Sequence, residues 1–267
     1  MTRSLPGPVR EVTGLFLSLA DERAPGLVEG LYLHGSLGFG EWYDGRSDID
    51  YVAVLAERPG EATVSLLSEV HDEVATTFQR PPFDGFHLTW DDLARSPYSC
   101  PDLPCTQAGL FHDAARLDVH PATWHELARH GVTVRGPDLA EVDVWTDDEV
   151  LRSYTRENLA GYWREQADAL AQFPAEAGRP DIVAWCVLGV SRLHHLLATG
   201  VLTSKTGAGR YAGARFGERW RPLLTEALAV RVTGESSGAY DHDPGRRAAD
   251  TVEFTDLVVR DGLALPD

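Results

Sequence analysis

Gly35-Ser36 and the pair Asp48 and Asp50 are the residues of this sequence best suited to chemistry. Residues two apart in an extended strand project from the same face, so both aspartates can turn their carboxylates toward one point. Mg2+ prefers such oxygen ligands and completes its shell with water and substrate phosphates. The spacing therefore predicts Asp48 and Asp50 as metal ligands and catalytic residues, and the alternative is a hairpin with a polar end.

The Gly35-Ser36 pair lies upstream of the two aspartates, across a loop rich in glycine. Glycine lets the backbone come close to a phosphate, and the Ser36 hydroxyl can donate a hydrogen bond to it. Together with a metal ion, these residues predict a site that binds a triphosphate.

The elements that must position these residues are two strands, expected over 31–34 and 49–55. Helices are expected over 9–20, 61–78 and 121–130, further strands over 85–90 and 116–120, and a loop over 96–107, which contains three prolines. From about residue 145 only helices are expected, over 147–173, 181–199, 208–230 and 246–263, with Asp181 as an N-cap and Gly200 as a C-terminal stop. The sequence thus predicts an α+β protein: a small mixed sheet with flanking helices over residues 1–140, then an all-α helical bundle over 141–267.

Gly35-Ser36 followed by Ser47-Asp48-Ile49-Asp50 resembles the signature of the nucleotidyltransferase superfamily of DNA polymerase beta type. The chain is most similar to the streptomycin and spectinomycin adenylyltransferases, strongly at this motif and weakly between residues 95 and 180. The segment 186–212, which contains Arg192 and Lys205, is also similar to their C-terminal domain.

This resemblance implies an N-terminal nucleotidyltransferase catalytic domain and a C-terminal helical domain that closes over ATP and an aminoglycoside. The implied reaction is Mg2+-dependent transfer of AMP from ATP to a hydroxyl of a small cationic acceptor, as in antibiotic resistance. Arg192 and Lys205 match positions that neutralise the triphosphate, although Arg192 as a mere surface charge is the alternative. Trp163 and Asp181 are implied to contact the acceptor, and a buried Trp163 is the alternative.

Members of this family also carry a third carboxylate on a later strand, where this sequence offers His87. Histidine suits general base catalysis because its ordinary pKa is about 6.5, but it binds Mg2+ poorly. Asp84, three residues earlier, projects to the opposite face of a regular strand. We therefore expect His87 to be the base; the alternatives are that Asp91 or Asp92 substitutes, or that activity is feeble or lost.

The composition limits the partners of the protein. Acidic residues outnumber basic ones by 41 to 24, for a formal net charge of -17. Such a charge disfavours nucleic acid and favours a cationic small molecule, although solubility alone also explains it. The three cysteines do not form a disulfide framework. Residues 1–10 lack the pattern of an export signal, and no stretch suggests a membrane span, so we expect a cytoplasmic protein with no membrane partner.

Other motifs fit known chemistry poorly. His125-Glu126 and His130 resemble a zinc-protease helix, but the two histidines are five residues apart and do not share a helix face. Lys205-Thr206-Gly207 lacks the upstream glycine of a phosphate-binding loop. Two functional alternatives stay open: the same transfer onto another metabolite or a protein, and a nucleotide- or drug-binding protein that has lost turnover because of His87.

Overall fold

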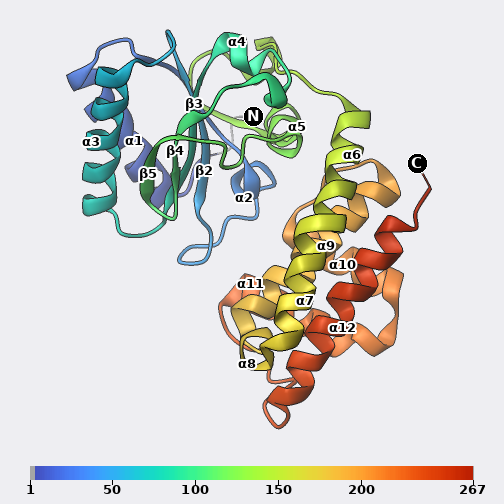
Figure 1. The fold of residues 1–267 in the computed structure, drawn as a ribbon. Helices are drawn as coiled ribbons and strands as arrows, with labels where there is room; N and C mark the ends of the chain where they lie inside the picture. Colours follow the sequence, from blue (N-terminus) through green and yellow to red (C-terminus); the bar gives the residue numbers. More distant parts are fainter. Residues whose placement is uncertain (1–3, 267) are drawn as a thin grey trace. The chain divides into compact units, whose positions relative to one another are not determined.

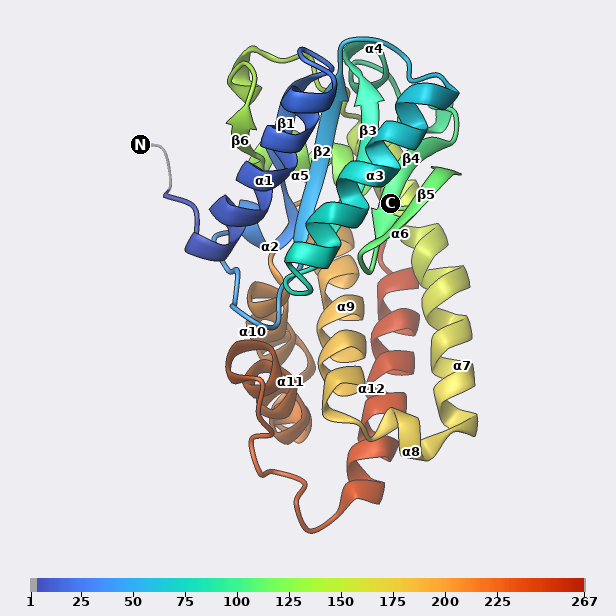
Figure 2. The ribbon, with the colours of Figure 1, turned by 90° about the vertical axis from the view of Figure 1, so that its left-hand side faces the viewer.

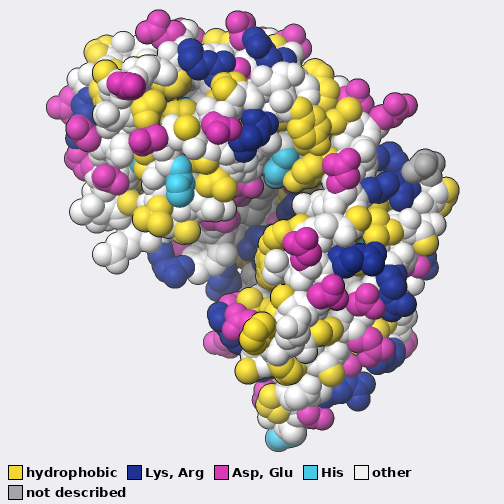
Figure 3. All heavy atoms as spheres, viewed as in Figure 1, with side chains coloured by type: hydrophobic (Ala, Val, Ile, Leu, Met, Phe, Trp, Pro, Cys, Tyr) yellow, Lys and Arg dark blue, Asp and Glu magenta, His cyan; other side chains and the backbone are white. Residues whose placement is uncertain are grey.

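The computed structural model describes residues 4–266. The chain forms two compact units, Met1–Asp147 and Asp148–Asp267, whereas the sequence placed the boundary at residue 140. The expectation about an export signal over residues 1–10 falls partly on residues 1–3, which lie outside the described residues. Figure 3 shows that acidic side chains are interspersed with basic ones over the visible face of both units.

The first unit is built on a mixed six-stranded sheet (Figure 1) with the order β5-β4-β3-β2-β1-β6, which Figure 2 shows strand by strand. Its central strands β2 and β3 are parallel, and every other neighbouring pair is antiparallel. This sheet, followed by a helical second unit, confirms the predicted fold class. The strands are β1 (Val28–Leu33), β2 (Ile49–Leu55), β3 (Phe83–Thr89), β4 (Leu103–Gln107), β5 (Leu110–Ala115) and β6 (Val132–Arg135).

Helices cover the two faces of this sheet. Helices α1 (Gly7–Arg23) and α3 (Glu61–Thr77) lie over one face, where Phe16 and Leu67 pack against Tyr51 and Ala53 (Figure 2). The other face meets α4 (Trp90–Leu93) and α5 (Pro121–His130), through a core that includes Val52 and Trp124. Because β2 alternates between these two cores, each of its side chains belongs to one face only.

Three strands differ from the sequence-based expectation. The prolines of 96–107 suggested a loop, yet β4 forms there because Pro104 lies where the pairing with β5 shifts register, a position that needs no ladder N–H. The chain then reverses at Ala108 and Gly109, both of which have positive φ, and β5 begins at Leu110. The strand expected over 116–120 is therefore found earlier in the chain, over Leu110–Ala115. The short edge strand β6 was not predicted.

The second unit is a helical bundle. Its central helix α9 (Pro180–Thr199) packs against α10 (Lys205–Phe216), α11 (Arg221–Thr233) and α12 (Pro244–Leu263). Gly217, with φ 85, ends α10 and divides the single helix expected over 208–230. Helix α9 ends at Gly200 as predicted, but its N-cap is Arg179, and Asp181 lies inside the first turn. The remaining helices are α6 (Asp148–Asn158), a π-helical turn (Leu159–Trp163), α7 (Arg164–Gln172) and α8 (Pro174–Ala177).

By length and composition alone, α9 is apolar enough to cross a membrane, contrary to the expectation that no stretch is, and within residues 4–266 it is the only such helix. In the structure, 56% of that stretch is buried. Its buried side chains, among them Val187 and Val190, belong to the core of the bundle. The apolar character of α9 is therefore explained by its central place among the other helices.

Candidate functional site

The Gly35-Ser36 corner follows β1 directly and begins the short helix α2 (Gly35–Gly38). Gly35 has φ 56, and a Cβ at this position would lie 2.0 Å from the Asp50 Oδ2. Only glycine therefore lets the backbone pass so close to that carboxylate. The Ser36 Oγ is buried and, within the part of the chain that the structure describes, has no hydrogen-bond partner. A buried hydroxyl of this kind is available to a ligand.

Three aspartates surround this corner. Asp50 and Asp84 are the second residues of β2 and β3 and pair directly in parallel register, so both half-buried side chains lie side by side on one face. Asp48 is exposed and immediately precedes β2. Burial and the charge of Asp48 raise the pKa of Asp50 to about 7. Burial and Asp48 likewise raise the pKa of Asp84, so the charge of Asp48 is close enough to repel both of the other carboxylates.

The turn between β4 and β5 holds the side chain of Asp84. The backbone N–H of Ala108 donates a hydrogen bond to one carboxylate oxygen and that of Gly109 to the other, each at 2.9 Å. Both residues have positive φ, at 52 and 75. This conformation directs two consecutive amides at the carboxylate and fixes its orientation.

These carboxylates fit a Mg2+ ion shared with substrate phosphates better than a metal ion that protein side chains alone would hold. Among residues 4–266, no Lys or Arg forms an ion pair with Asp48, Asp50 or Asp84, although like charges this close favour a cation. The described residues also contain no group of three or more His, Cys, Asp or Glu arranged to hold a metal by themselves. Mg2+ is usually bound by one or two carboxylates and substrate phosphates, which is the chemistry that this corner offers.

His87 does not join these carboxylates. It is fully buried on the opposite face of β3, under α1 and α3, with its ring 6.1 Å from the ring of Phe16. Its Nδ1 donates to the carbonyl oxygen of Pro104 at 3.1 Å, and its Nε2 lies 3.2 Å from the Nε2 of His71. Burial lowers its pKa to about 4. The structure thus corrects the expected placement. Asp84 and His87 do lie on opposite faces of β3, but the residue on the same face as Asp50 is Asp84 and not His87.

The two other acids considered for the third carboxylate lie at the far end of β3, on α4. Asp92 is fully buried, accepts hydrogen bonds from Thr89 and forms an ion pair with Arg58 at 2.6 Å. The Asp91 side chain is 87% exposed. Asp84 lies at the start of β3, whereas Asp91 and Asp92 follow its end, so neither belongs to the group of carboxylates around Gly35.

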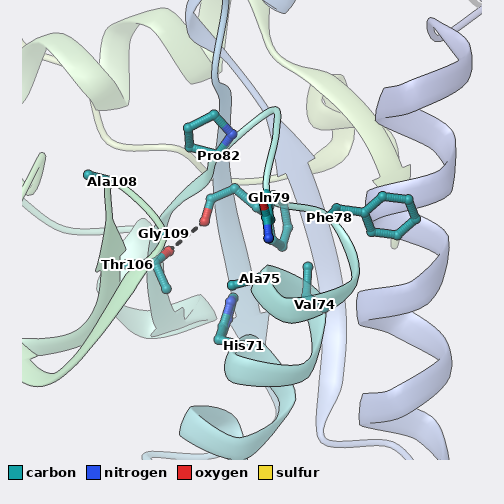
Figure 4. Close-up of a pocket in the computed structure, with 10 residues that line it drawn as sticks. His71, Val74, Ala75, Phe78, Gln79, Pro82, Thr106, Ala108 and Gly109 are labelled. Carbon is teal, nitrogen blue, oxygen red and sulfur yellow. Dashed lines mark hydrogen bonds between the residues drawn. The ribbon is translucent and has the colours of Figure 1, made fainter. Parts of the chain in front are cut away.

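A cavity of about 230 Å³ lies on the histidine face of the sheet (Figure 4). His71, Thr106 and Gln79 provide its polar side chains, and its remaining lining is apolar or glycine. No Asp, Glu, Lys or Arg lines it. The cavity therefore lacks the charges that a triphosphate or Mg2+ requires, although Ala108 and Gly109, whose amides bind Asp84, also line it.

The four remaining predicted site residues belong to the second unit. Arg192 on α9 and Lys205 at the start of α10 are both half-buried, on helices that pack against each other. Trp163 is 5% exposed, and its ring lies 4.8 Å from that of Trp185 in the core, which matches the alternative of a buried tryptophan. Asp181 is exposed and receives two hydrogen bonds from Arg179, at 2.6 and 3.2 Å.

Sequence reasoning missed Asp84, His34 and Glu126 as neighbours of the site. Asp84 was set aside because it projects to the face of β3 opposite to His87, and His87 was expected on the face of the two aspartates; the register of β3 with β2 places Asp84 there instead. Both Asp50 and Asp84 follow the first residue of their strand, and this shared position was the signal available in the sequence. Burial lowers the pKa of His34, but Glu126 and Asp50 outweigh burial, so the pKa of His34 is raised.

Comparison with known proteins gives a structural match without a match in sequence. No protein-family model matches the chain, and no curated protein matches its sequence. The fold is similar to that of the spectinomycin adenyltransferase AAD(9) from Enterococcus faecialis, solved with ATP and spectinomycin. The TM-score is 0.65 at 12% identity, over 92% of this chain and 98% of that chain. At this identity the match is one of fold, and it confirms the predicted resemblance to a spectinomycin adenylyltransferase as a resemblance of fold.

Proposed function

We propose that this chain, which has the fold of an adenylyltransferase, transfers AMP from ATP to a hydroxyl of a small cationic acceptor such as an aminoglycoside. One observation carries the proposal. Asp50 and Asp84 pair in register on one face of the sheet, beside the Gly35-Ser36 corner. The fold match to a protein solved with ATP and spectinomycin supports it.

In this proposal Asp48 and Asp50 hold Mg2+, and Asp84 replaces His87 as the general base. The bound metal supplies positive charge against the triphosphate. Ser36 donates its unpartnered hydroxyl to a phosphate oxygen, and Gly35 lets the backbone approach it. The two amides of the β4–β5 turn keep Asp84 oriented, and its raised pKa makes it a stronger base than an ordinary aspartate.

The reaction follows from these roles. The acceptor hydroxyl oxygen attacks the α-phosphorus of ATP, and its proton passes to the carboxylate of Asp84. The bond from the α-phosphorus to the oxygen bridging the α- and β-phosphates breaks, and pyrophosphate leaves with that oxygen. The leaving group carries negative charge, and Arg192 and Lys205 stay the residues proposed to stabilise it.

The acceptor is proposed to be cationic because the protein carries a formal net charge of -17. Asp181 stays a proposed acceptor contact, since it is an exposed acid paired only with the equally exposed Arg179 among the described residues. For Trp163 the core position supports a role in packing α7 and α9 in place of acceptor contact. We also propose that the enzyme acts in the cytoplasm, where its three free, buried cysteines stay reduced.

The test is a panel of aminoglycosides and spectinomycin incubated with the protein, ATP and Mg2+, analysed by mass for an AMP adduct. We expect an adduct on at least one drug, and none with Asp84→Asn. Pyrophosphate release without any drug adduct would indicate that the acceptor is another metabolite or a protein. Binding of ATP and drug without pyrophosphate release would instead contradict transfer and identify a binding protein.

A further inference from the structure

Helix α5 packs directly against the short helix α2 that carries the Gly35-Ser36 corner. A Cβ on Gly38 would lie 2.7 Å from the carbonyl oxygen of His130, the last residue of α5. The rings of Phe39 and His130 lie 4.4 Å apart, centroid to centroid. The end of α5 therefore limits how far α2 can move.

A second contact joins the same two segments closer to the aspartates. Glu126 on α5 is 7% exposed, and its Oε2 lies 3.7 Å from the Nδ1 of His34, which is 6% exposed. His34 is the residue before Gly35, and its backbone N–H donates to the carbonyl oxygen of Asp50 at 3.0 Å. The carboxylate of Glu126 thus faces the buried imidazole of the residue that immediately precedes the corner.

The sequence of α5 explains why these contacts occur together. Glu126 and His130 are four residues apart and so share one face of the helix, which is the face toward α2. His125 points elsewhere, and its Nε2 accepts a hydrogen bond from the Asp147 N–H at 3.1 Å. The motif that resembled a zinc-protease helix is therefore divided between two different structural contacts.

We propose that α5 supports the phosphate-binding corner and that Glu126, acting through His34, is a positioning residue for the nucleotide. This inference rests on the proposed function, because it assumes that a triphosphate binds at Gly35 and Ser36. Glu126 touches no reacting atom. Its carboxylate lies 3.7 Å from the His34 Nδ1, an ion-pair distance without a hydrogen bond, and the backbone N–H of His34 donates to the carbonyl oxygen of Asp50 beside Gly35.

The test uses calorimetry to measure the Kd of the protein for the Mg2+ complex of a non-hydrolysable ATP analogue. It compares the wild type with Glu126→Gln, His34→Gln and the double variant. We expect Glu126→Gln to raise this Kd about 10-fold, in the range seen when groups that orient a ligand are removed. Because Glu126 acts through His34, the double variant should bind no more weakly than His34→Gln alone. Glu61→Gln, an exposed acid at the start of α3, is the matched control and should leave the Kd unchanged.

Two further readouts separate positioning from general support of the fold. The KM for the acceptor should stay within about 2-fold of the wild type, and the melting temperature should fall by only a few degrees. An unchanged Kd, additive effects of the two substitutions, or equal weakening of both substrates with a large loss of stability would overturn the role of Glu126. A wild-type protein that binds no nucleotide would overturn the proposed function itself, so the two failures are distinguishable.

Discussion

The titratable residues on the two faces of the central sheet lie in different environments, and their pKa values are shifted for different reasons. On one face Asp50 and Asp84 lie side by side at the starts of β2 and β3, without a Lys or Arg ion pair among the described residues, and burial together with the charge of Asp48 raises the pKa of each. On the other face His71 and His87 lie among aromatic rings, and burial lowers the pKa of each. Both histidines are hydrogen-bonded inside the protein.

This contrast shows how to distinguish a reactive group from a structural one. His87 has the chemistry of a general base, but both of its ring nitrogens are engaged in hydrogen bonds inside the protein, so neither is available to accept a proton from a substrate. The aspartates have unsatisfied charge and lie next to an unpartnered hydroxyl. A perturbed pKa occurs on both faces, so the pKa alone does not distinguish them; the aspartate face differs in its uncompensated carboxylates beside the unpartnered Ser36 hydroxyl.

The largest expected effect tests the aspartate face. Asp84→Asn should lower kcat for AMP transfer about 100- to 10,000-fold, because the amide cannot accept the proton of the acceptor hydroxyl. Steady-state kinetics would measure this, with circular dichroism to verify the fold. Asp91→Asn, an exposed acid on α4, is the control and should leave kcat unchanged. Full activity in Asp84→Asn would remove Asp84 from the reaction.

A second substitution tests the histidine face. His87→Ala should lower the free energy of unfolding by about 2–4 kcal/mol, because it leaves a cavity and deprives His71 and the Pro104 carbonyl of a partner. Below the unfolding temperature, kcat per folded molecule should stay within about 3-fold of the wild type. Denaturant titration and activity assays would measure both. A loss of kcat as large as that of Asp84→Asn, with normal stability, would return His87 to the reaction.

The two faces should also respond to pH with opposite signs. The pKa of His87 is lowered to about 4, so its contribution to stability is present above pH 6.5 and is lost as the pH falls toward 4. The pKa of Asp50 is raised to about 7, so without Mg2+ its contribution is present below pH 3.8 and is lost as the pH rises to 7.

Because both windows cover about pH 4 to 6.5, the two slopes oppose each other in the wild type, and stability measured between pH 4 and 8 in a chelator separates them only through the variants. Asp50→Asn should remove the part of stability that is lost as the pH rises, and His87→Gln should reduce the part that is lost as the pH falls. Added Mg2+ should raise the melting temperature more at pH 8 than at pH 6, because protons compete for Asp50 at the lower pH. An Mg2+ effect that is equal at both pH values, or that persists in Asp50→Asn, would contradict a metal site at Asp50.

The smallest expected effect concerns the turn that orients Asp84. Gly109→Ala places a side chain at φ 75 without any clash, so it should cost about 1–2 kcal/mol of stability through backbone strain. It should also lower kcat several-fold, because the Gly109 amide holds Asp84. Gly26→Ala has the same strain, at φ 80, in the turn after α1. Comparing the two variants isolates the effect on Asp84; equal kcat values would mean that the turn does not position it.

The sequence by itself determined the local features of this protein. The Gly35-Ser36 corner, the strand that follows Asp48, the short helix at Pro121–His130 and the stop at Gly200 could all be read from residue types and spacing. Such features depend on neighbouring residues, because periodicity, proline and glycine act over a few positions. The mixed sheet and the helical second unit followed from these patterns.

Only the tertiary structure decided which carboxylate completes the site. Asp84 and His87 were expected on opposite faces of β3, and the parallel register with β2, which the residues of β3 alone do not set, places Asp84 and not His87 beside Asp50. The same holds for Glu126, whose partner His34 is distant in the chain and is brought near by the packing of α5 on α2. Which polar groups are left open to a ligand emerges only when all the strands and helices are assembled, because satisfaction and burial are properties of the packed molecule.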